Sequence, residues 1–202
     1  TGVNITAWEA DNVSHGEDAR EYVVIHNEIP GGLEKTIVER LEMDPTKIKN
    51  MKLTGKITKE DYDFMRDKMT SLQRLNLKEV ESKCYFGKSA SDVNGPRYHA
   101  IPEEAFNEKS TLIKCVLPDK LEYIYPYAFQ GTSLTGMLLL PEGLKYVSGF
   151  GDTKITGVQF PNTLEEIGDY AFWTCTSLMT EISLPEPVKI IGNGASNLSS
   201  IK

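Results

Sequence analysis

Three cysteines are the side chains of this sequence with the greatest capacity for covalent chemistry. Cys84, Cys115 and Cys175 are odd in number and too few for a disulfide framework. A catalytic thiol depends on a base held beside it, and the sequence indicates no such base. Cys115 and Cys175 fall at positions expected to be buried, where a small apolar side chain suffices. Cys84 has no structural explanation at this level.

The remaining candidates for acid–base or metal chemistry are no better supported. The histidines, His15, His26 and His99, lack a partner at the spacing of a zinc site. Adjacent carboxylates such as Glu165 and Glu166 point to opposite faces of an extended chain, which does not suit an acid–base pair. The sequence also lacks phosphate-binding, dinucleotide-binding and nucleophile-elbow motifs. We therefore predict that the protein is not an enzyme and uses no cofactor and no metal.

Composition and charge limit the kinds of partner that the chain can bind. The 202 residues carry a formal net charge of −7 without a basic run, so nucleic acid is not expected to bind. The longest apolar run, residues 137–140, is far shorter than the roughly 18 residues of a membrane span, so we expect no transmembrane segment in this chain. It starts at Thr1 without a signal peptide, as a processed chain does, and any signal or anchor segment is expected to lie outside it.

A repeat in the second half of the chain reveals the elements that position any binding residues. Prolines recur at spacings of 23, 20 and 24 residues, with apolar residues one and three positions before each proline and three and six positions after it. The alternation before the proline predicts a short strand with one buried face, and an Ala–Phe pair often follows the last apolar residue. The prolines are Pro118, Pro141, Pro161 and Pro185, and the pairs are Ala105–Phe106, Ala128–Phe129 and Ala171–Phe172.

These units predict a solenoid, because one unit of about 20–24 residues cannot bury its own apolar edge and must stack on its neighbours. The fold class is thus an α/β repeat with short parallel strands on one face. Two units depart from the pattern. The third continues as residues 148–152 without an Ala–Phe pair, which predicts a tighter turn. In the last, Leu198 follows Ala195 so soon that either the turn is truncated or residues are missing there.

The pattern I-x-x-x-A-F…L…L-P-x-x-L-x-x-I resembles the BspA-like leucine-rich repeat. The matching segments are Ile101–Ile124, Ile124–Val147 and Ile167–Ile191, and the resemblance covers about residues 97–202. It implies a leucine-rich-repeat solenoid, a cell-surface or secreted location and a macromolecular ligand, as in bacterial cell-surface repeat proteins.

The first hundred residues lack the proline pattern but contain related elements. Leu72, Leu75 and Leu77 match the strand template, and Thr58 with Asp61 marks the start of a helix before it. Further upstream, the sequence predicts an amphipathic helix over residues 33–43 and a strand over residues 48–55.

These elements suggest a division of the chain into two parts. We assign residues 1–56 to an N-terminal α/β capping region, because the end of a solenoid needs a cover with a polar outer face. Residues 57–202 form the leucine-rich repeats. These comprise a degenerate first repeat at 57–81, a loop at 82–98 and BspA-like repeats at 99–202.

The strand residues two and four positions before each proline point away from the predicted core. Val116, Met137 and Leu139 give this face an exposed apolar patch, and such patches often mark contact sites. The candidate partner-binding residues are Arg74, Asn76, Lys114, Val116, Met137, Leu139, Gln159, Glu181 and Ser183. We predict a cell-surface or secreted binding or adhesion module whose partner is a protein or host-surface macromolecule.

Two other functions fit the sequence. Tyr85, Phe86 and Tyr98 lie in or beside the 82–98 loop, and aromatic rings there can stack on sugars. This favours a carbohydrate-binding or accessory module of a surface glycan system, although the loop is also explained as an insertion between cap and repeats. The third possibility is a structural spacer without a ligand.

Overall fold

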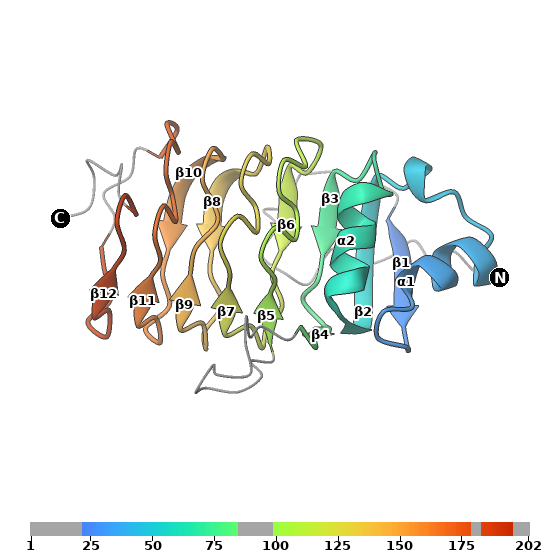
Figure 1. The fold of residues 1–202 in the computed structure, drawn as a ribbon, viewed down its shortest axis with the longest axis horizontal. Helices are drawn as coiled ribbons and strands as arrows, with labels where there is room; N and C mark the ends of the chain where they lie inside the picture. The colour runs from blue at the N-terminus through green and yellow to red at the C-terminus, as the bar shows by residue number, and fades with distance from the viewer. Residues whose placement is uncertain (1–21, 85–98, 179–182, 196–202) are drawn as a thin grey trace.

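The chain folds into an elongated solenoid in which short parallel strands lie in two rows along the long axis (Figure 1). The computed structural model describes residues 22–84, 99–178 and 183–195. The first strand row contains β1 (Val23–Asn27), β2 (Asn50–Ile57), β3 (Arg74–Asn76), β6 (Lys114–Val116), β8 (Thr135–Leu139) and β10 (Lys154–Gln159). The second strand row contains β4 (Val80–Ser82), β5 (Ala100–Ile101), β7 (Tyr123–Ile124), β9 (Tyr146–Val147), β11 (Glu166–Ile167) and β12 (Ile190–Ile191). The predicted leucine-rich-repeat solenoid is confirmed.

The strands of the first row pair in two parallel sheets, β1-β2-β3-β6 and β8-β10, and those of the second row from β5 to β12 pair in one, while β4 pairs with β2. Within each sheet the register places like residues side by side. In the first strand row, Leu75 pairs with Met51 on one side and Cys115 on the other. In the second, Ile124 pairs with Ile101 and Val147. Every unit therefore contributes an apolar residue at the same height, and stacking buries what no single unit could bury alone.

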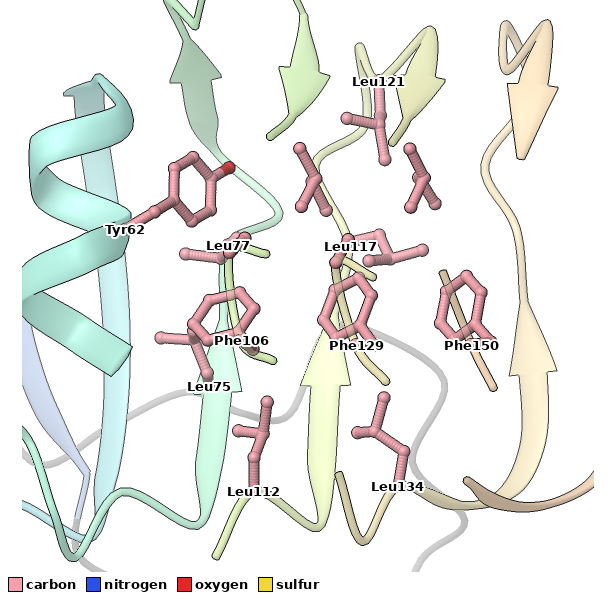
Figure 2. Packing of buried hydrophobic residues seen from close by; sticks show 14 of the residues in the cluster. Tyr62, Leu75, Leu77, Phe106, Leu112, Leu117, Leu121, Phe129, Leu134 and Phe150 are labelled. Carbon is pink, nitrogen blue, oxygen red and sulfur yellow. The ribbon is translucent and has the colours of Figure 1, made fainter. Parts of the chain in front are cut away.

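A column of aromatic rings runs through the core between the two rows (Figure 2). Phe106, Phe129, Phe150 and Phe172 stack in series, with ring centroids 5.4, 4.9 and 5.7 Å apart. Tyr62 extends the column from the N-terminal side, edge-on to Phe106 at 5.7 Å. All five side chains are almost completely buried, so the column is the continuous centre of the molecule.

The third unit keeps its place in this column although it lacks an Ala–Phe pair, and its turn is tighter, as predicted. Gly149 takes the position of the alanine, and Phe150 supplies the ring. The turn before them is two residues shorter than in its neighbours, so the backbone comes close to the preceding unit. Gly149 has φ +81°, and a Cβ there would lie 2.5 Å from the backbone nitrogen of Ala128. Only glycine fits this turn without displacement.

Helices replace the short turns in the N-terminal units. The predicted 33–43 helix is present as α1 (Leu33–Lys35) followed directly by the π-helical η1 (Thr36–Arg40), with the 3₁₀ turn η2 (Pro45–Lys47) beyond it. It ends earlier than predicted, and Leu41, expected on its buried face, is exposed. The second helix, α2 (Lys59–Asp67), starts after Thr58 as predicted. The assigned division at residue 56 falls inside β2, a strand that pairs with β1, β3 and β4.

One buried carboxylate ties these helices together. Asp61 accepts hydrogen bonds from the backbone N–H of Thr58 at 2.9 Å, of Gly31 at 2.7 Å and of Leu33 at 2.8 Å. The bond to Thr58 caps α2, and the other two hold the start of α1. A single side chain thus satisfies donors at the beginning of both helices.

A second buried charge joins α2 to the repeats. Lys109, three residues after Phe106, donates from Nζ to the carbonyls of Arg66 at 3.0 Å and Met69 at 2.9 Å, at the end of α2. Cations at a helix C-terminus are favourable, because the last carbonyls lack helical partners. Later units carry Thr132 and Thr153 at this position, where each hydroxyl donates to a carbonyl of its own turn.

Candidate interaction surface

The outward side chains of β3, β6, β8 and β10 form a surface that we name the strand face. Its centre is β8, where Met137 is 56 % exposed and Leu139 is 48 % exposed, while Leu138 between them packs against the core. The register with β10 sets Met137 beside Gly157 and Leu139 beside Gln159. Because Gly157 has no side chain, the flank of Met137 on that strand stays uncovered. The two aliphatic side chains are therefore presented to solvent together.

The N-terminal end of the strand face is formed by β3 and β6. Arg74 pairs with Lys114, and Asn76 pairs with Val116. Arg74, Lys114 and Val116 are half-buried, so they contribute to the surface as predicted but less than Met137 and Leu139 do.

Asn76 does not belong to the exposed surface, and its predicted outward position is wrong. It is 1 % exposed. The register places it between Lys52 of β2 and Val116 of β6, whose longer side chains flank it. Its Oδ1 turns back to accept a hydrogen bond from the backbone N–H of Lys78 at 2.9 Å, as asparagine does in turns. Asn76 thus shapes the chain after β3 instead of facing a partner.

The C-terminal end of the strand face is polar. Gln159 and Ser183 are both exposed, as predicted from their positions before the repeat prolines. Glu181 lies outside the described residues, so its predicted place on the face stays a prediction.

The strand face differs in charge from the molecule as a whole. The chain has a net charge of −7, yet β3, β6, β8 and β10 contain neither aspartate nor glutamate. Their charged residues are Arg74, Lys114 and Lys154, and Lys154 is exposed at the start of β10. An aliphatic centre with a cationic margin suits a partner that offers apolar and acidic groups.

Two of the cysteines, Cys84 and Cys175, are buried, and Cys115 is half-buried. Cys84 is buried, and the Ser82 hydroxyl donates to its sulfur at 3.3 Å, which accounts for the one thiol that the sequence left unexplained. Burial raises the pKa of Cys84 and of Cys115 to about 12, and it also raises the pKa of Cys175. The reactive species is the thiolate, so all three stay protonated at neutral pH.

The other chemical candidates are scattered over the molecule. His26 is exposed and shares a hydrogen bond with the Thr54 hydroxyl at 2.9 Å. Within the described ranges, no cluster of three or more His, Cys, Asp or Glu side chains could hold a metal ion. Of the residues suggested for sugar stacking, Tyr85 and Phe86, like Tyr98, lie outside the described part of the chain.

The turns of the repeats carry a second set of exposed side chains that was not predicted from the sequence. Tyr127, Tyr170 and Trp173 are 44 %, 53 % and 44 % exposed. Tyr127 and Tyr170 directly precede the alanine of the Ala–Phe pair, and Trp173 directly follows its phenylalanine. The repeat pattern does not give this exposure, because the residue before the pair is buried in the third unit, where Ser148 is 1 % exposed.

The sequence is similar to a known family of repeats. A sequence model of the BspA-type leucine-rich repeat region matches residues 43–149 and 146–202, with 6 copies of the repeat. No curated protein matches the sequence as a relative. Across residues 22–84, 99–178 and 183–195, no helix is long and apolar enough to cross a membrane.

Proposed function

Because the chain belongs to the BspA-type leucine-rich repeat family, we propose that it is a protein-interaction or adhesion module that binds its partner on the strand face. Leucine-rich repeats generally mediate protein interactions, and proteins of this type are typically bacterial surface or secreted proteins. A surface or secreted location is accordingly part of the proposal. The mechanism is non-covalent: a rigid ladder presents side chains from successive units to one partner.

One observation carries this proposal. Met137 and Leu139 stand exposed on one strand, in the part of the molecule that lacks acidic side chains. Single exposed aliphatic side chains are common on protein surfaces. A contiguous apolar patch with a polar margin is instead typical of a contact site. The parallel register keeps the patch rigid, so binding costs little ordering of the backbone.

The side chains favour a protein over a glycan at the strand face. Met137 and Leu139 are flexible or branched aliphatic groups that pack into the apolar pockets of a protein partner. Flat sugar rings instead stack on aromatic side chains, and β3, β6, β8 and β10 contain none. The cationic margin further favours a partner with acidic groups at the rim of the contact.

The test uses a double variant, Met137→Asp with Leu139→Asp. Binding of the purified protein to a panel of extracellular-matrix proteins and to cultured epithelial cells is measured beside the unchanged protein. We expect an affinity loss of at least about a hundredfold, because central apolar contacts carry most of the binding free energy of an interface. Both residues are exposed, so the thermal midpoint should stay the same.

The matched control is Ile190→Asp, which replaces an exposed aliphatic residue on the second strand row. It should leave binding intact. Unchanged affinity of the double variant, or equal losses in the double variant and the control, would contradict the strand face as the binding surface.

A further inference from the structure

The turn edge of the solenoid carries three exposed aromatic side chains, of which the Tyr170 ring also lies against Gly194 of the next unit. Tyr127, Tyr170 and Trp173 are each exposed by more than two fifths. The rings of Tyr170 and Trp173 meet edge to face, with centroids 6.0 Å apart, so each fixes the orientation of the other. Rigid, half-exposed tyrosine and tryptophan side chains are typical of binding surfaces, because they combine an apolar face with a polar tip.

The backbone at two of these positions is unfavourable for a bulky residue. Tyr127 has φ +60° and Tyr170 has φ +53°, in the left-handed region that glycine and asparagine prefer. The corresponding residue of the last unit is Gly194, with φ +61°. Glu104, at the same position of the first unit, has φ +61°, so the turn imposes the left-handed conformation and each tyrosine adopts it at a conformational cost.

The shortened third unit lies between the aromatic positions. Tyr127 belongs to the unit before it and Tyr170 to the unit after it, so their backbones are two unit spacings, about 10 Å, apart. Hydrogen bonds join the three turns: Phe129 N–H donates to the Gly149 carbonyl, and Phe150 N–H donates to the Ala171 carbonyl. The aromatic side chains therefore stand on either side of a turn that carries glycine at 149 and 151.

Hydrogen-bonding side chains lie on the turns next to Tyr170 and Trp173. A Cβ added at Gly151 would have the Gln130 side-chain oxygen 3.6 Å away and the Trp173 carbonyl 3.3 Å away. Asp152, next in the chain, is exposed and accepts a hydrogen bond from the Thr174 hydroxyl. An amide, a carboxylate and a hydroxyl are thus placed within one turn of the aromatic pair.

We propose that this edge is a binding site for neutral glycans. The flat C–H face of a pyranose packs on the Trp173 ring with Tyr170 beside it, and vicinal hydroxyls hydrogen-bond to the Asp152 carboxylate and the Gln130 amide. Asp152 and the net charge of −7 disfavour uronic and sulfated sugars. The site is separate from the strand face and does not depend on the function proposed there.

Calorimetry and tryptophan fluorescence test the proposal on the full chain. The probes are cello-, malto-, manno- and laminari-oligosaccharides, with oligogalacturonate as the acidic comparison. We expect at least one neutral series to bind and to shift the emission. Trp173→Ala and Tyr170→Asn should each weaken that binding about tenfold. Asparagine suits the left-handed backbone at 170, so Tyr170→Asn removes the ring without disturbing the turn.

A second type of variant keeps all rings and adds a side chain at Gly151, whose Cβ would lie between the Gln130 side chain and the Trp173 carbonyl. Gly151→Asn introduces the residue that Asn107 provides at the same position of the first unit, and it should block binding while the fold persists. Tyr123→Ala, on the second strand row, and the strand-face double variant should bind the glycan normally. The proposal fails if no neutral oligosaccharide binds, if Trp173→Ala binds as well as the unchanged protein, or if oligogalacturonate or a proline-rich peptide binds instead.

Discussion

The two halves of the solenoid build the same parallel ladder with different means. Residues 22–84 use helices, and their ends are joined by individual hydrogen bonds to Asp61 and Lys109. Residues 99–178 use short turns, and their units share features: each has a phenylalanine in the column, and two of them have a threonine whose hydroxyl caps the turn. The first half is held by single unique contacts, whereas the second is held by repeated ones.

The charges of the second half show how far the repetition goes. Glu122, Lys145, Glu165 and Lys189 hold the same position in consecutive units and alternate in sign. Lys145 lies 2.6 Å from Glu122, and Lys189 lies 3.6 Å from Glu165. Exposed pairs of this kind stabilise little individually, but like charges at neighbouring positions would repel. The alternation therefore favours the observed alignment of adjacent units.

Removing a ring from the aromatic column should cause the largest loss in the free energy of unfolding. Phe129→Ala removes a ring that stacks on both Phe106 and Phe150 and leaves a cavity. We expect a loss of about 3–5 kcal/mol in the free energy of unfolding, measured by urea titration. Tyr123→Ala on the outer side of β7 is the control and should cost far less. A loss below about 1 kcal/mol for Phe129→Ala would mean that the column is not what holds the repeats together.

The short turn of the third unit allows a sharper test within the repeats. Gly149→Ala combines a left-handed backbone with a Cβ placed 2.5 Å from a backbone nitrogen, and should cost about 3 kcal/mol. Gly136→Ala is the matched control, because φ is +84° there but nothing lies within 4 Å of the added carbon. It should cost about 1 kcal/mol. Equal losses would show that the close approach of the turns at Gly149 is unimportant.

The N-terminal half is probed by Asp61→Asn. The amide keeps one accepting oxygen but turns an N–H₂ group toward backbone donors, so at least one bond to Gly31, Leu33 or Thr58 is lost. We expect a loss of about 2 kcal/mol, with faster amide hydrogen exchange at Gly31 and Leu33 and little change beyond residue 99. Asp63→Asn on the outer side of α2, where Asp63 pairs with Lys59 and Arg66, should cost below about 1 kcal/mol.

The contrast between the halves also explains what the sequence could predict. The proline spacing was sufficient for the repeat, the parallel strands and the buried rows, because each unit repeats the same local pattern. The place of Phe150 in the aromatic column was not predicted, because a glycine in a shortened turn stands where the other units have an alanine. The burial of Asn76 was not predicted, because alternation gives the direction of a side chain but does not show that its oxygen accepts a hydrogen bond from the nearby backbone.

The repeat pattern could not predict the long-range contacts. Asp61 bonds to Gly31, thirty residues earlier, and Lys109 reaches carbonyls some forty residues before it. No periodicity connects such positions, since each contact occurs once. The strand face followed from the repeat, whereas the aromatic turn edge needed the coordinates to show that Tyr170 and Trp173 stay exposed.

The smallest expected effect is a pH dependence of the unfolding free energy. It arises from Lys109, which joins the two halves. Burial lowers the pKa of Lys109 to about 8 from its usual 10.5, so the unfolded chain binds more protons between these values and stability rises with pH. Relative to Lys109→Met, the unchanged protein should gain about 1 kcal/mol in unfolding free energy between about pH 7 and pH 9. Urea titrations of both proteins across this range check the slope. Parallel curves would show that the Lys109 amine titrates normally, and that its bonds to the end of α2 hold the charged form without a burial cost.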